Sequence, residues 1–175
     1  MTALSMPTSQ TQGVIGGLVA SWIKALSEPA LQVAVERLLP PSPAQKLDVG
    51  ADPSGHPENM PPAVVADRAV RALGRPGLSV PQRVRIQLVI HYAFGAGLGV
   101  AYRTATSRWP AIRRGGGGPA GLAIYAGTHA SLLPALGIQR PPWRLAPAAV
   151  VWESTSHLVF GVALEAARTA LGGRR

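Results

Sequence analysis

The stretch VRIQLVIHYAFGAGLGVAY, residues 84–102, is predominantly apolar and contains one histidine, His91. Gly95 and Gly99 are four residues apart, so on a helix they share a face, a spacing that lets membrane helices approach closely. A helix needs about 20 residues to cross the hydrocarbon core of a bilayer. The stretch therefore predicts a membrane span over about residues 84–105.

Three further apolar stretches have similar lengths and cover about residues 13–33, 117–137 and 146–167. With the span over 84–105, they predict an all-α protein, a four-helix transmembrane bundle forming a single membrane domain over 1–175.

The first connection, residues 42–83, is polar and is expected to lie outside the membrane. Within it, residues 63–73 carry apolar side chains at helical spacing, with charged residues opposite. This pattern predicts a short amphipathic helix on the bilayer surface or on the bundle.

Composition favours a bacterial inner-membrane protein. Charged residues make up 14 % of the chain, well below the roughly 25 % of soluble domains. Lysine and arginine number 17 against 8 acidic residues, which gives a net charge of +9. The basic residues are scattered between apolar runs, so a nucleic-acid partner is not expected. The chain has no cysteine, which excludes disulfides and thiolate metal sites.

The basic residues also predict an orientation. The first twelve residues contain no lysine or arginine, unlike a signal peptide, so the first apolar segment is expected to be a retained anchor. Arginines crowd the second connection and the C-terminal end, which lie on one side of a four-span chain. Basic residues prefer the cytoplasmic side, so both termini are predicted in the cytoplasm. The arginines are Arg103, Arg108, Arg113, Arg114, Arg168, Arg174 and Arg175.

Five ionisable side chains interrupt the apolar segments: Glu28, His91, His129, Glu153 and His157. An ionisable group facing lipid at the helix centre costs roughly 2.5–3.5 kcal/mol. With about 1.5 Å of rise per residue, their depths converge on the membrane side that carries the first and third connections. We therefore predict one polar cluster between the helices. In a simpler interpretation, each side chain only hydrogen-bonds to a neighbouring helix.

Small residues share the helix faces of these polar side chains, and such faces are expected to pack inward. Glu153 and His157 are four residues apart, and Gly161 continues their row. The glycines expected to pack helices together are Gly95, Gly99, Gly121 and Gly161.

The order of several short motifs resembles the YagU-like family of bacterial inner-membrane proteins, a family of unknown function. The resemblance is strongest over residues 84–167 and looser upstream, at Trp22, Glu28 and Pro61-Pro62. The motifs are His91-Tyr-Ala-Phe-Gly through Tyr102, Arg108-Trp-Pro-Ala-Ile112, Gly117 to Gly121, His129, Pro134, Pro141-Pro-Trp143 and Glu153-Ser-x-x-His157.

This resemblance implies four membrane helices and, because one family member is associated with acid tolerance, a role in acid resistance. It supplies no catalytic residue, cofactor or reaction. The chain departs from the family in its Arg- and Gly-rich second connection and its proline-rich first loop.

Two main hypotheses follow. In the favoured one, the protein is non-enzymatic, an accessory subunit or stress-related factor whose His/Glu cluster is structural or proton-responsive. In the alternative, the cluster transports a proton or metal, or binds a divalent metal or haem. The favoured hypothesis predicts no cofactor. The expected partners are the lipid bilayer and either other membrane-protein subunits or a second copy of this chain. A soluble, basic nucleic-acid-binding protein ranks third.

Overall fold

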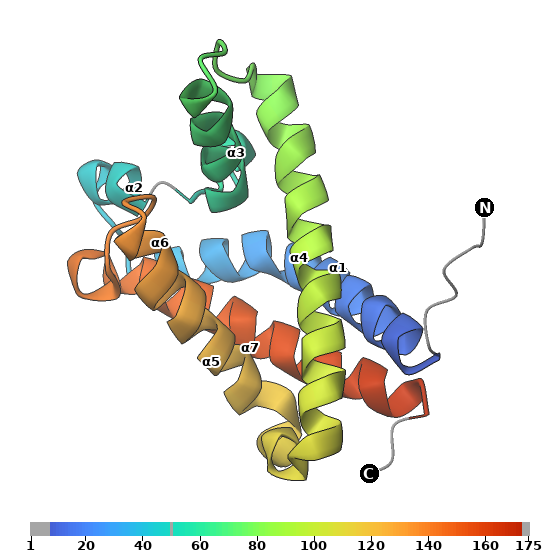
Figure 1. The fold of residues 1–175 in the computed structure, drawn as a ribbon. Coiled ribbons are helices and arrows are strands. Elements are labelled where there is room, and N and C mark those ends of the chain that lie inside the picture. Colours follow the sequence, from blue (N-terminus) through green and yellow to red (C-terminus); the bar gives the residue numbers. More distant parts are fainter. Residues whose placement is uncertain (1–7, 50, 173–175) are drawn as a thin grey trace.

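The structure is a computed structural model, in which residues 8–49 and 51–172 are described. These residues form helices joined by short turns, with no β-strand among them and a single isolated bridge between Asp52 and His56. The all-α prediction is confirmed. The α-helices are α1 (Thr8–Leu38), α2 (Pro43–Val49), α3 (Pro61–Ala72), α4 (Val80–Arg108), α5 (Gly118–Gly127), α6 (Leu133–Ala135) and α7 (Pro147–Ala170) (Figure 1).

Prolines mark most of the helix boundaries. Helix α1 ends before Pro40-Pro41, and α4 ends before Trp109-Pro110, because a proline disfavours helical geometry in the residue that precedes it. At the start of α4 the Gln82 side chain accepts a hydrogen bond from the Ser79 amide at 2.9 Å, so a polar group at the helix entrance is satisfied.

The connections hold more helix than the sequence indicates. Helix α3 covers most of the range 63–73, but α2 lies in the same polar connection and was not predicted. Between α5 and α6 the chain forms a π-helical turn, Thr128–Leu132, so residues 118–135 make one continuous but irregular helical stretch.

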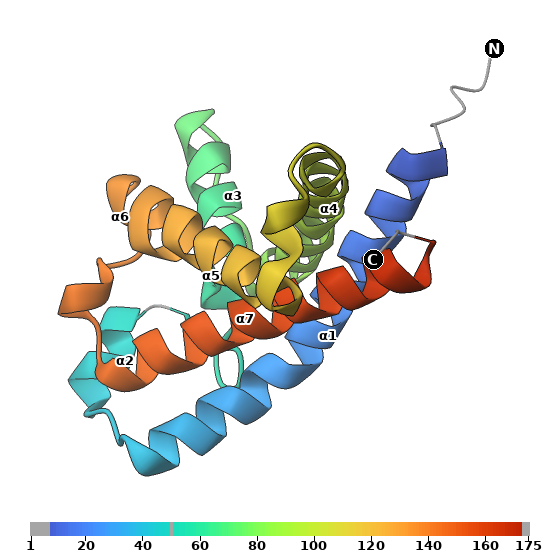
Figure 2. The same ribbon diagram turned by 90° about the horizontal axis from the view of Figure 1, so that it is seen from below.

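Helix α1 packs against both α4 and α7, α5 packs against α7, and α3 packs against α4. Figures 1 and 2 show that α4 crosses α1 and α7 steeply, so the long helices splay instead of running parallel. Helix α7 is the most buried, with Trp152, Phe160 and Leu164 in the core.

Glycines form the closest helix crossings. A Cβ atom on Gly99 would collide with the backbone of Gly13 and Gly17 in α1. In the same way, a Cβ atom on Gly121 would collide with the His157 backbone in α7, and one on Gly161 with Gly117. The four glycines expected to pack helices therefore lie at backbone-to-backbone contacts, two at the α1–α4 crossing and two at the α5–α7 crossing.

Among the described residues, two helices are long and apolar enough to cross a membrane, α1 and α4. In α4 only 11 % of the most apolar window is buried inside the protein, against 33 % in α1. Helix α4 thus leaves Leu88, Val89 and Phe94 exposed. The helical stretch 118–135 and α7 cover most of the other two predicted spans but do not meet the same criterion.

Candidate functional site

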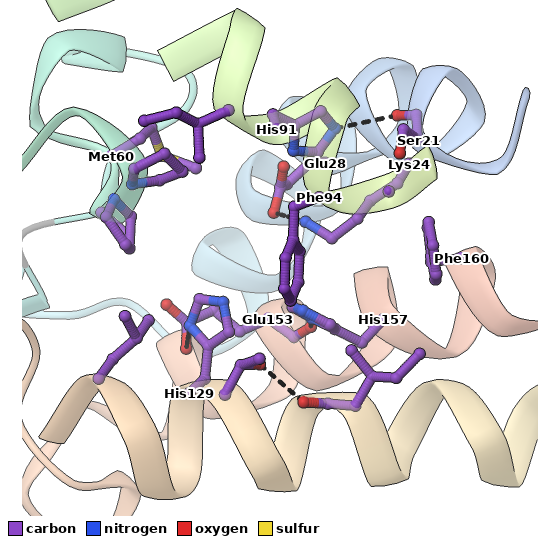
Figure 3. A pocket seen from close by; sticks show the side chains of 18 of the residues that line it. Ser21, Lys24, Glu28, Met60, His91, Phe94, His129, Glu153, His157 and Phe160 are labelled. Atoms are coloured by element: carbon purple, nitrogen blue, oxygen red, sulfur yellow. Dashed lines mark hydrogen bonds and ion pairs between the residues drawn. The ribbon is translucent and has the colours of Figure 1, made fainter. Parts of the chain in front are cut away.

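All five predicted site residues line one cavity of about 240 Å³. The cavity lies between α1, α3, α4, the 118–135 helical stretch and α7. Figure 3 shows side chains converging on it from α1 (Lys24, Glu28), α4 (His91, Phe94) and α7 (Glu153, His157). Apolar side chains, among them Phe94, make up most of the wall around these polar groups.

Glu153 is the centre of the polar contacts, with only 1 % of its surface exposed. The Gln139 amide nitrogen donates to Glu153 Oε1 at 2.6 Å, and the same amide's oxygen lies 2.9 Å from His129 Nδ1. His129 Nδ1 is also 3.5 Å from Glu153 Oε2. Gln139 therefore links the imidazole of the π-helical turn to the carboxylate of α7.

The two histidines beside Glu153 also contact each other. The rings of His129 and His157 meet edge to face, with their centroids 4.8 Å apart. Tyr125 stacks on His129 at 5.9 Å and lies 5.6 Å from His157. The Tyr125 hydroxyl and Glu153 Oε2 are buried without a hydrogen-bond partner among the described residues.

Hydrogen-bond partners fix which ring nitrogens carry protons. A backbone carbonyl only accepts, so His157 Nδ1 donates to the Glu153 carbonyl at 2.8 Å, and His91 Nε2 donates to the Ser21 carbonyl at 3.2 Å. Since Gln139 donates its amide to Glu153, its oxygen accepts from His129 Nδ1. The second nitrogen of each neutral ring is therefore the one free to take a proton.

Lys24 and Glu28 form a buried ion pair on α1. Lys24 Nζ lies 2.5 Å from Glu28 Oε1, and both residues are less than 10 % exposed. Ser156 Oγ lies 3.4 Å from the same carboxylate oxygen and 2.9 Å from the Glu153 carbonyl. Ser156 therefore connects the Lys24–Glu28 pair to the α7 side of the cavity.

The five predicted residues differ in how closely the structure brings them together. Glu153, His129 and His157 are in direct contact, and Glu28 joins them through Ser156. His91 lines the cavity from α4 but makes no hydrogen bond to the other four within residues 8–49 and 51–172.

Sequence reasoning missed Gln139 and Ser156. Gln139 lies in the connection between α6 and α7, where an amide is ordinary, yet it is 6 % exposed. A serine inside a helix is equally inconspicuous. No pattern in the sequence distinguishes either residue, because their role depends on which carboxylates the fold places beside them.

The described residues contain no group of three His, Asp or Glu side chains arranged to hold a metal ion. The divalent-metal alternative therefore has no preformed ligand set in this part of the chain.

Comparison with known proteins identifies a family. Residues 29–166, which are 138 of the 175 residues, match the family described as "Protein of unknown function (DUF1440)". The chain belongs to this family. No curated protein and no solved structure matches it.

Proposed function

We propose that this member of the DUF1440 family is an integral inner-membrane protein with four spans and a non-enzymatic, proton-responsive pocket. The observation that carries the proposal is the gathering of Glu28, His91, His129, Glu153 and His157 around one cavity. Ionisable groups inside a membrane are costly, and they are tolerated where they face one another within the protein.

Helix lengths support the membrane assignment. With 31 and 29 residues, α1 and α4 are roughly 46 and 43 Å long, more than the roughly 30 Å of hydrocarbon. Helices longer than the core cross it at a tilt, which agrees with the steep crossing of α4 over α1. The exposed apolar side of α4 would face lipid.

A contact between two connections supports the four-span topology. The Arg68 guanidinium on α3 donates to the carbonyls of Leu136 and Gly137, at 2.9 and 2.7 Å. Arg68 belongs to the first connection, and the two carbonyls begin the third. A four-span chain places these two connections on the same side of the membrane.

The charges of the pocket explain why a proton would bind there. Among the described residues that line it, Lys24 is the one cation, and Glu28 and Glu153 are the two carboxylates. With these groups ionised and the histidines neutral, the pocket carries one unbalanced negative charge. One proton on a histidine would neutralise the pocket, and His129 is the best placed because it already lies 3.5 Å from Glu153 Oε2.

Protonation would reshape the α5–α7 side of the pocket. A charged His129 would strengthen its pairing with Glu153, while its neighbour His157 would meet a cation at ring-contact distance. The motif order that resembles YagU-like proteins, and the acid tolerance associated with one of them, supports a role in acid resistance. A proton-responsive pocket of this kind suits an accessory subunit or a stress-related factor.

Trp152 provides a test, because it lines the cavity and is 2 % exposed. The other tryptophans, Trp22, Trp109 and Trp143, would be replaced by Phe, and the protein placed in lipid nanodiscs. Emission from Trp152 is expected to change in one step when the medium is acidified from pH 8 to pH 5, because uptake of a proton by the pocket would alter the surroundings of the indole ring. H129Q should remove the step.

The control is H56Q, because His56 lies outside the pocket and is exposed. H56Q is expected to titrate like the parent. A parent protein with constant emission over this range, or a step that survives in the H129Q/H157Q double variant, would show that the pocket is structural only.

A further inference from the structure

A second hollow, of about 580 Å³, lies at the opposite end of the molecule from α2 and α3. It is formed where the start of α1, the ends of α4 and α7, and the turn over residues 110–117 come together. Its lining includes Ser9, Gln10, Thr104, Thr106, Ser107, Pro110 and Gly172.

Four arginines line this groove: Arg103, Arg108, Arg113 and Arg168. Among the described residues of the lining there is no carboxylate. Glu165 offsets one of the charges, because it binds Arg168 through two hydrogen bonds of 2.7 Å. The groove therefore retains an excess of positive charge and attracts anions.

The guanidinium group of Arg103 has one paired and one unpaired nitrogen. Its Nη2 donates to the Gln12 side chain, whereas its Nη1 is buried without a hydrogen-bond partner among the described residues. A buried, unpaired donor on a charged group is costly. A ligand that brings an anionic oxygen to Nη1 would remove this cost.

We infer that the groove binds the headgroup of an anionic phospholipid, an inference that rests on the proposed membrane insertion. Arg103 follows His91 by twelve residues, roughly 18 Å along α4, which places the groove near the headgroups when the pocket lies within the hydrocarbon. Trp109 directly follows Arg108, the last residue of α4, and is 60 % exposed. Aromatic side chains that anchor a protein at a membrane interface are exposed in this way. Basic pockets between membrane helices on the cytoplasmic side are suited to anionic headgroups.

The test compares lipid retention by native mass spectrometry. Protein extracted from vesicles of equal parts phosphatidylglycerol and phosphatidylcholine should keep phosphatidylglycerol preferentially. Because an interfacial basic residue contributes on the order of a fivefold effect, R108Q should lower this preference about fivefold, and R103Q/R108Q should lower it further. R108Q is the variant least expected to disturb folding, because the Arg108 side chain is exposed.

The matched control is R37Q/R144Q, which removes two exposed arginines at the other end of α1 and before α7. This control is expected to keep the preference. Equal retention of both lipids, or an unchanged preference in R103Q/R108Q, overturns the inference. So does stabilisation of the detergent-purified protein by inorganic phosphate but not by phosphatidylglycerol, which would assign the groove to a free anion.

The two proposals fail in distinguishable ways. If alkaline carbonate releases the protein from membranes, membrane insertion fails, and the lipid site with it. If the protein stays in the membrane but shows no lipid preference, only the lipid site fails.

Discussion

At the scale of single residues, the sequence located the ionisable groups but not their partners. A charge in an apolar stretch is conspicuous because lipid penalises it, which singles out Glu28 and Glu153 without any coordinates. Gln139, which bridges His129 to Glu153, lies in a connection and could not be recognised. Lys24 could be interpreted either as a partner of Glu28 or as snorkelling, and the structure shows it paired and buried.

Outside the pocket, Asp67 holds α3 and the start of α4 together. It accepts hydrogen bonds from Arg71, the Leu78 amide and Arg83, at 2.9, 2.6 and 2.7 Å. The bonds from Arg71 and the Leu78 amide lower the pKa of Asp67 below its ordinary value of 3.8. A lowered carboxyl pKa stabilises the folded state above the ordinary pKa, and this stabilisation is lost as the pH falls through the folded-state value.

We therefore predict that D67N loosens α3 at pH 6, and that its difference from the parent shrinks as the pH falls below 3.8. Hydrogen exchange of the α3 amides measures this directly, with faster exchange in D67N at pH 6 and convergence with the parent as Asp67 is protonated. R75Q is the control, since it removes an exposed charge from the same loop without touching Asp67. A constant difference between D67N and the parent over this pH range would contradict the prediction.

At the scale of helices, glycine spacing predicted one side of each crossing. Gly95 and Gly99 could be predicted from their separation of four residues. Gly121 and Gly161 could be predicted because they share helix faces with polar residues. Their partners Gly13, Gly17 and Gly117 were not identified as packing residues. Glycine spacing on one helix indicates that another helix packs closely against that face. Which residues lie opposite depends on which helices the fold places side by side.

Two glycines on α4 separate packing from helix propensity. Gly99 lies against α1, whereas a Cβ on Gly97 would meet nothing within 4 Å. Both substitutions to alanine gain about 0.5–1 kcal/mol of helix preference. We predict that G97A keeps or raises the melting temperature in detergent, while G99A lowers it, because overpacking costs about 1–3 kcal/mol. Equal melting temperatures for G97A and G99A would show that α1 and α4 can move apart at this crossing without loss of stability.

At the scale of the whole molecule, the sequence predicted where helices lie better than how they meet. Helical residues cover most of all four apolar ranges, since apolar composition and length both favour helix there. The steep crossing of α4 and the π-helical turn at Thr128–Leu132 could not be predicted. Crossing geometry depends on the side chains of both partners, which the pattern on one helix does not contain.

The four-span topology makes a prediction that differs from that of a chain with only α1 and α4 in the membrane. The chain lacks cysteine, so single cysteines can be introduced at exposed positions: N59C, S107C, R144C and G172C. In intact cells, a membrane-impermeant maleimide is expected to label N59C and R144C, and to label S107C and G172C only after the membrane is opened. R144C decides the question, because it lies between the 118–135 helical stretch and α7. If α1 and α4 were the only spans, R144C would be protected together with S107C.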